Sequence, residues 1–338
     1  MQADLFVSPK LSPNSSEGSR VILGEGPVVL GDRLLTTDAR RSLIRSTDLS
    51  SGQTEDIDLA AILRDSDLIP REAPNPVLGS LGPTRDGKLL TALATGIYLF
   101  DPAKRSMTEL THPEAERHAE RPHYNDGKIG PDGAFYVGGM IGGREGAGRL
   151  LRIAPDGSFT EPQRGNPPLT TPNGLHWFAT DSPDVWDFYY VCSQYPAIQR
   201  YRHTLSTGEM VREADLISLP RDTFGYLDGM AGTSNGLLIL ALYLPVEYGC
   251  IVVDTRTGSI VERISTGVPQ TTSVALRGGE IYITTAAQEY GDAEFAQFPN
   301  AGGIFRCFAQ DAESELLRAA REDTVASGFR FESRSPSG

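Results

Sequence analysis

Four oxygen-bearing side chains occupy similar positions ahead of polar turns that lie far apart in the chain. Glu25, Asn125 and Asp228 each lie seven residues before an Asp or Asn of such a turn, and Asn173 lies eight residues before Asp181. Carboxylate and amide oxygens suit hard cations such as Ca²⁺, Mg²⁺ or Mn²⁺, and the absence of Cys and His at these positions argues against structural zinc. Two carboxylates at one place repel each other unless a cation or a proton lies between them. The pattern predicts one oxygen-ligated divalent metal site, provided that the fold brings the four residues together.

The turns belong to a degenerate repeat that predicts such a fold. Each unit has a polar hairpin turn, an apolar strand, a short gap and a second strand, and six units follow one another at intervals of about 45 to 55 residues. The six turns are Gly31-Asp32, Asp86-Gly87, Asp132-Gly133, Asp181-Ser182, Asn235-Gly236 and Gly278-Gly279. This interval is the size of one four-stranded propeller blade, whereas a parallel α/β fold requires a helix in every unit. The sequence predicts an all-β, six-bladed β-propeller with four-stranded blades and a short helical decoration.

A propeller brings equivalent positions of successive blades to one rim of its central channel, so the four side chains are expected to converge there. The equivalent positions in the second and sixth units are small or polar, near Gly79 and Thr271. The Asn-Gly and Asp-Gly pairs at residues 173–174 and 228–229 also have a simpler interpretation, because such pairs are typical of hairpin turns. The shared register of the four residues favours the site.

The propeller is expected to form a single domain over residues 1–338, with a core at about 20–307 and a C-terminal tail at 308–338. Residues 56–65 and 311–322 have helical patterns, and the first is expected to overhang the mouth of the channel. A terminal strand, either LFV around Phe6 or VIL around Val21, is expected to pair with the last blade and close the ring. Substrate specificity is expected to depend on loops over the mouth, including residues 53–76 and 288–300.

Composition excludes several classes of partner. The chain has 338 residues and a net charge of −13, so it repels nucleic-acid phosphates and anionic membrane surfaces. It has neither a signal-like N-terminus nor a long apolar run, which predicts a soluble, cytoplasmic protein that acts on a small molecule. Its three cysteines form no CxxC pair and are expected to be reduced, buried and structural. The oligomeric state stays open.

Five ordered segments carry a family resemblance. They are GEGPVVLGDRLLTTD (24–38), NDGKIGPDGAFYVGGM (125–140), PNGLHW (172–177), LDGMAGTSNGLLILAL (227–242) and NAGGIFRC (300–307). Together they resemble the successive signatures of the SMP-30/gluconolactonase/luciferin-regenerating-enzyme family, in the right order over residues 20–307. Five ordered matches are far more specific than any one of them.

The resemblance implies a role for each of the four residues. Glu25, Asn173 and Asp228 would be the protein ligands of the metal, and Asn125 would bind substrate or complete the metal shell. Asp228 would also be the base that takes the proton of the attacking water. Ca²⁺ fits these donors best, although a partly open oxygen site also admits Mn²⁺, Fe²⁺ or Zn²⁺.

One departure from the family pattern concerns the substrate. The sugar-lactone hydrolases of the family usually have an arginine two residues before the Asn of NDGK, where this chain has His123. Arg121 is close by but out of register. We expect His123, Arg121 and Tyr124 to contact substrate together with Asn125. The departure leaves the metal assignment intact and weakens the inference of a sugar lactone.

The resemblance implies a lactonase-like hydrolase, in which the metal acts as a Lewis acid and Asp228 as general base on a lactone or related ester. A second reading keeps the metal and changes the reaction to that of an isomerase or cyclase of specialised biosynthesis, or of an organophosphate hydrolase. A third reading is a non-catalytic binding propeller. It is disfavoured because a scaffold has no need for Glu25 and Asp228 in the same register.

Overall fold

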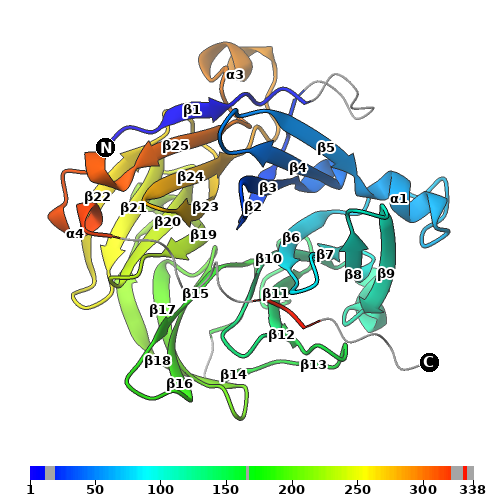
Figure 1. The fold of residues 1–338 in the computed structure, drawn as a ribbon. Coiled ribbons are helices and arrows are strands. Elements are labelled where there is room, and N and C mark those ends of the chain that lie inside the picture. The colour runs from blue at the N-terminus through cyan, green and yellow to red at the C-terminus, as the bar shows by residue number, and fades with distance from the viewer. Residues whose placement is uncertain (12–19, 165–166, 321–329, 333–338) are drawn as a thin grey trace.

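Six sheets, antiparallel except for one short added strand, surround a central axis in the computed structural model (Figure 1), which describes residues 1–11, 20–164, 167–320 and 330–332. The first three blades comprise β2 (Gly24–Leu30), β3 (Arg33–Asp38), β4 (Leu43–Asp48) and β5 (Thr54–Asp58); β6 (Leu78–Pro83), β7 (Leu89–Leu93), β8 (Gly96–Asp101) and β9 (Ser106–Thr111); and β10 (His123–Ile129), β11 (Phe135–Met140), β12 (Arg149–Ile153) and β13 (Phe159–Thr160). The other three comprise β15 (Pro172–Ala179), β16 (Val185–Cys192), β17 (Ala197–Thr204) and β18 (Glu209–Ser218); β19 (Tyr226–Gly232), β20 (Leu237–Tyr243), β21 (Gly249–Asp254) and β22 (Ser259–Ser265); and β23 (Thr271–Arg277), β24 (Glu280–Thr285) and β25 (Ile304–Phe308). The six-bladed propeller is confirmed.

The N-terminal strand closes the ring. β1 (Asp4–Val7) pairs antiparallel with β25 as the outer strand of the sixth blade, with Leu5 opposite Phe305. The expectation for LFV is therefore confirmed. The segment around Val21 forms no strand with that blade, and the ring begins at Asp4 rather than near residue 20. The fourth blade carries a fifth, short strand, β14 (Gln163–Arg164), which runs parallel to β18.

The expected helix at residues 56–65 is only partly helical. Residues 54–58 form β5, in which Oδ1 of Asp56 forms an ion pair with Nε of buried Arg45 at 3.0 Å. Asp58 then caps α1 (Leu59–Asp65) by accepting the N–H of Ala61 at 2.8 Å. α1 packs its apolar side chains into the core between the first two blades and lies at the outer edge of the ring (Figure 1), so the expectation that it overhangs the mouth is wrong.

The other helices are short. Of the region predicted helical at 311–322, the structure forms a 3-10 turn, η3 (Ala309–Asp311), and α4 (Glu315–Arg318), while residues 321–322 lie outside the described residues. Helices α2 (Arg221–Phe224) and α3 (Asp292–Gln297), with the 3-10 turns η1 (Ala39–Arg41) and η2 (Ala115–Glu120), belong to connections that were not predicted to be helical. Within the described ranges, no helix combines the length and apolar character needed to cross a bilayer.

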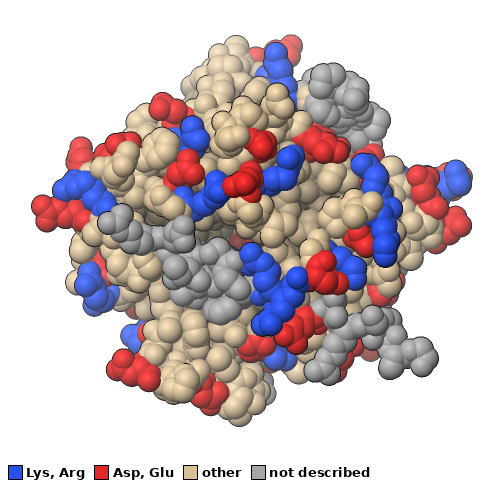
Figure 2. Space-filling model, viewed as in Figure 1, with Lys and Arg blue, Asp and Glu red and all other residues tan. Residues whose placement is uncertain are grey.

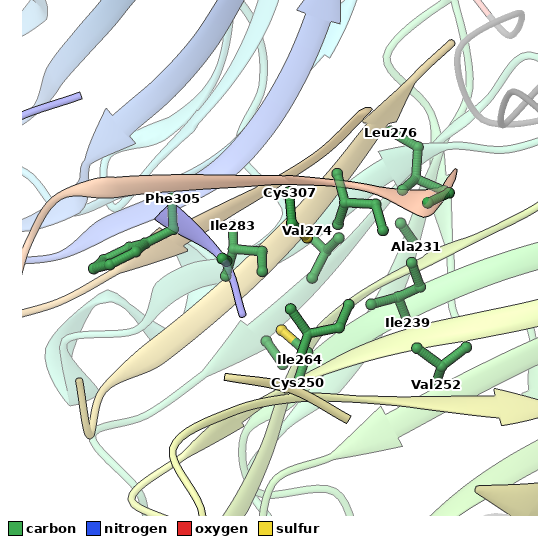
Figure 3. Packing of buried hydrophobic residues seen from close by; sticks show 14 of the residues in the cluster. Ala231, Ile239, Cys250, Val252, Ile264, Val274, Leu276, Ile283, Phe305 and Cys307 are labelled. Carbon is green, nitrogen blue, oxygen red and sulfur yellow. The ribbon is translucent and has the colours of Figure 1, made fainter. Parts of the chain in front are cut away.

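Apolar side chains from facing blades pack against one another to hold the ring together. Figure 3 shows this packing between the fifth and sixth blades, where Ile239 and Val252 belong to the same buried cluster as Val274 and Ile283. All three cysteines are buried and free, as expected, and burial raises the pKa of Cys307 to about 12. Acidic and basic side chains are intermingled on the face seen in Figure 2.

A polar triad lies inside the core between the third and fourth blades. Trp177 donates its indole N–H to Nδ1 of His203 at 3.1 Å, and the Tyr136 hydroxyl lies 3.1 Å from Nε2 of the same ring. An imidazole that accepts at one nitrogen is neutral. Burial lowers the pKa of His203 to about 4.

This histidine makes the fold sensitive to acid. The unfolded His203 binds a proton near its ordinary pKa of about 6.5 while the folded one stays neutral to about 4, so stability falls as pH drops through this window. We expect a loss of about 3 kcal/mol in the free energy of unfolding across the window. His203→Gln keeps an acceptor for Trp177 and should flatten the dependence in urea titrations from pH 7 to 4. Equal slopes for the variant and the wild type would contradict this assignment.

Candidate active site

A β-bulge interrupts the inner strand of every blade at the same level. The register shifts between Glu25 and Val28, Leu78 and Ser80, Tyr124 and Gly127, Pro172 and Leu175, Leu227 and Met230, and Thr271 and Ser273. A bulge bends a strand and re-aims its side chains. The bulges thereby bring the four predicted oxygen side chains to one level around the axis. In the sixth blade the extra residue is Thr272 rather than Thr271.

The glycines that follow Asn173 and Asp228 permit the inner strands to approach each other. A Cβ on Gly174 would lie 2.5 Å from the carbonyl oxygen of Asp228, and one on Gly229 would lie 2.0 Å from Oγ of Ser273. Both pairs lie within strands, so the hairpin interpretation of these Asn-Gly and Asp-Gly pairs is wrong. Glycine is required there by close approach of backbones, a demand that sequence alone does not distinguish from a turn.

The bulges surround a cavity of about 340 Å³ that is lined by Glu25, Asn125, Asn173 and Asp228. Its size is that of a small-molecule site. The carboxyl groups of Glu25 and Asp228 thus face the same cavity, at the same end of the channel. The structure brings all four candidate metal ligands together.

The two carboxyl groups are in an environment that disfavours their charge. Burial raises the pKa of Asp228 well above its usual range, and the neighbouring charge of Asp126 raises it further. Burial likewise raises the pKa of Glu25, followed by the charges of Asp228 and Asp126. Oδ1 of Asp228 is buried and accepts no hydrogen bond from the described residues. A cation would relieve both the repulsion and the missing contact.

The two asparagines present oxygen rather than nitrogen to a ligand. Asn125 donates its Nδ2 to the carbonyl of Pro172 at 2.7 Å, and Asn173 donates its Nδ2 to Oγ of Ser193 at 2.9 Å. Ser193 donates in turn to the carbonyl of Leu227 at 2.7 Å, which fixes its lone pairs toward Asn173. The amide oxygens are therefore the atoms left for a ligand.

The donor set fits a hard cation. No group of three His, Cys, Asp or Glu among the described residues is placed to hold a metal, so an ion here depends on the amide oxygens as well as on the two carboxylates. Two carboxylates and two amides form an all-oxygen set, which suits Ca²⁺ better than a soft metal.

The residues expected to contact substrate divide into two groups. His123 lines the cavity with Asn125, and burial, followed by the charge of Arg40, lowers the His123 pKa. Tyr124 lies between them in β10 and, because side chains alternate along a strand, it is buried in the core of the second and third blades, where its hydroxyl accepts the N–H of Glu114 at 3.4 Å. Arg121 precedes the strand, is exposed and does not line the cavity. The structure therefore does not place Tyr124 and Arg121 where they could contact substrate.

Several lining residues outside the inner strands were not among the predicted site residues. They include Arg40 after β3, Gln194 after β16, Tyr243 at the end of β20 and Gln288 after β24. Residues 53–76 contribute none of the lining, whereas residues 288–300 contribute Gln288. Counting along the inner strands alone does not reach these loops.

Comparison with known proteins agrees with this architecture. Residues 23–287 match the SMP-30/Gluconolactonase/LRE-like region. The chain belongs to this family. Its curated relatives include regucalcin of Gallus gallus, 24% identical over 299 residues that cover 85% of this chain and 91% of the relative. They also include 6-deoxy-6-sulfogluconolactonase of Pseudomonas putida, 26% identical over 295 residues, or 84% of this chain and 90% of the relative.

The family fold extends to solved structures. A structure described as the calcium-binding protein regucalcin from Agrobacterium tumefaciens superposes with a TM-score of 0.75 at 20% identity and covers 98% of this chain and 97% of that one. At this identity the likeness establishes the propeller fold and leaves the chemistry to the residues of the site.

Proposed function

We propose that this protein is a metal-dependent hydrolase of a lactone or related ester of a small molecule. The observation that carries the proposal is the meeting of Glu25, Asn173 and Asp228 in one cavity, with Oδ1 of Asp228 buried and unpartnered among the described residues. A family relative named as a lactonase supports the reaction class. A structural relative described as calcium-binding supports the metal.

The metal would be held by Glu25, Asn173 and Asp228, and Asn125 would complete the shell or bind substrate. Ca²⁺ is the ion that matches these oxygen donors best. Such a cation supplies Lewis acidity toward a carbonyl oxygen and lowers the pKa of a bound water.

The side chains supply the remaining parts of the reaction. Asp228 takes a proton from water as the water oxygen bonds to the lactone carbonyl carbon, and it returns that proton to the ring oxygen when the ester C–O bond breaks. The product is a hydroxy acid. Asn125 and His123, which lie on the same strand of the cavity wall, orient the substrate. The enclosing walls hold the reacting groups in a fixed geometry.

A panel of sugar and aliphatic lactones, assayed by pH-stat in CaCl₂, tests the proposal. We expect acid release that depends on the added cation and incorporation of one oxygen-18 from labelled water into the acid product. An isomerase or cyclase with the same site would leave the product unlabelled, and a binding propeller would release no acid. Either result would reject hydrolysis.

A further inference from the structure

Arg40 is the single lysine or arginine among the residues that line the cavity. It lies in η1, the 3-10 turn between β3 and β4, and is exposed at the mouth. In the part of the chain that the structure describes, Arg40 forms no ion pair, although the protein carries a net charge of −13. Its neighbour Arg41, in contrast, pairs with Asp38 at 3.0 Å.

A hydrogen-bonded chain holds the Arg40 guanidinium over the cavity. Its Nε and Nη2 donate to Oε1 of Gln288 at 3.2 and 3.1 Å. Gln288 donates its Nε2 to the Tyr243 hydroxyl at 3.3 Å, which fixes its Oε1 toward Arg40. The backbone of Gln288 is held on both sides by the buried amide of Gln270, at 2.7 and 3.0 Å. The guanidinium is thus oriented by neutral groups, and its other N–H donors meet no carboxylate among the described residues.

The charges of the cavity leave this cation unmatched. Glu25 and Asp228 are the two carboxylates of the lining. In the proposed function their two negative charges balance the two positive charges of one divalent ion. A guanidinium presents N–H donors in a planar fork that binds a carboxylate through two parallel hydrogen bonds. A cavity with one unmatched and preorganised guanidinium at its mouth is complementary to an anionic group on the ligand.

We propose that Arg40, positioned by Gln288, binds a carboxylate of the substrate at the end remote from the ester. The substrate is then a lactone that carries a free carboxylate in addition to its cyclic ester. This inference rests on the proposed hydrolase function. It also gives a reason for His123 at the position where related sugar-lactone hydrolases have arginine: here the guanidinium enters the cavity from the first blade instead of the third.

The test compares two lactones of similar size, D-glucaro-1,4-lactone, which carries a carboxylate, and the uncharged D-glucono-1,5-lactone. We expect the wild type to favour the charged lactone in kcat/KM, and Arg40→Gln to reduce the ratio of the two kcat/KM values about tenfold, mainly through KM. This tenfold change is at the low end of the range for losing a hydrogen bond between charged groups, because the Arg40 side chain is partly in water. Arg40→Lys should recover part of the ratio as a point charge. Arg277→Gln is the matched control. Arg277 pairs with Asp32 at the end of the channel opposite the cavity, so this variant should leave the ratio unchanged.

A binding measurement separates this inference from the hydrolase proposal. Calorimetric titration with the open-chain dianion D-glucarate should show affinity that falls about tenfold in Arg40→Gln and is retained in Arg277→Gln. If the wild type hydrolyses neither lactone, the proposed function fails, yet weaker glucarate binding by Arg40→Gln still supports the anion site. An unchanged kcat/KM ratio in Arg40→Gln, or equal glucarate affinity in Arg40→Gln and wild type, overturns the inference.

Discussion

Replacing Asp228 by Asn is expected to reduce kcat for lactone hydrolysis by about 10²- to 10⁴-fold, because the amide cannot accept the proton of the attacking water. The substitution keeps the size of a side chain that is only 7% exposed and faces the cavity, so the fold should persist. Turnover is measured by pH-stat at saturating lactone and CaCl₂, and the melting temperature confirms folding. The cation concentration must be raised until turnover no longer increases, since Asp228 is also a proposed ligand.

Asp126→Asn is the matched control for this result. Asp126 is a carboxyl whose pKa is raised by burial, as is that of Asp228, and it lies in the bulge of β10, two blades away from the β19 strand of Asp228. It lines the channel beyond the cavity, beside Lys128, rather than the cavity itself. We expect turnover within about tenfold of wild type, because no reacting atom contacts it. Comparable losses in the two variants, or a wild-type rate in Asp228→Asn, would contradict the role of Asp228.

The ring was predictable because its signals are local. Each blade needs a tight turn at the same end, and turns such as Asp132-Gly133 and Asn235-Gly236 are encoded by two adjacent residues, the glycine of each having positive φ. Closure by β1 was predictable only as one of two alternatives, since LFV and the segment around Val21 are both short and apolar. The pairing of β1 with β25 depends on where residues far apart in the chain meet.

The helical pattern at residues 56–65 shows why the boundaries between elements were predicted wrongly. The stretch DIDLAAILRD reads as one amphipathic segment, yet Asp56 faces Arg45 across β4 and β5, and that buried ion pair holds the first residues in the sheet. The helix begins only after Asp58, whose carboxylate caps it. The ion-pair partner on the adjacent strand determines the local structure here, and the intrinsic propensities of residues 56–65 do not reflect that contact.

The site was predictable where it depends on the repeat and not elsewhere. Glu25, Asn125, Asn173 and Asp228 occupy equivalent positions of inner strands, so a count from the turns finds them. Tyr124 was misplaced because neighbours on a strand face opposite sides. Arg40 and Gln288 come from connections of unequal length between the second and third strands of their blades, for which no repeat gives a register.

Removing the divalent cation is expected to make the fold less stable as pH rises. Without a cation, burial raises the pKa values of Glu25 and Asp228 in the folded protein, and neighbouring charges raise them further: Asp126 acts on Asp228, and Asp228 and Asp126 act on Glu25. The folded state then binds protons more tightly than the unfolded state, whose carboxyls titrate near pH 4, so stability is present below about pH 4 and is lost as pH rises through the raised values. Added Ca²⁺ should displace these protons, and at about 100 times its Kd it should raise the melting temperature by about 5 °C, with a larger gain at pH 8 than at pH 5.

Glu25→Gln separates this effect from the other titrating groups of the protein. The amide removes one of the two repelling charges, so in EDTA the variant should melt above the wild type at pH 8, with a difference that shrinks toward pH 4.5. His203, which acts in the opposite direction between about pH 4 and 6.5, is present in both proteins and cancels from the comparison. The variant should also gain less than half of the wild-type shift from Ca²⁺, because it lacks a charged ligand. Equal Ca²⁺ shifts in the two proteins would show that Glu25 does not ligate the cation. A wild type that melts above the variant at pH 8 in EDTA would show that the Glu25 charge does not destabilise the metal-free fold.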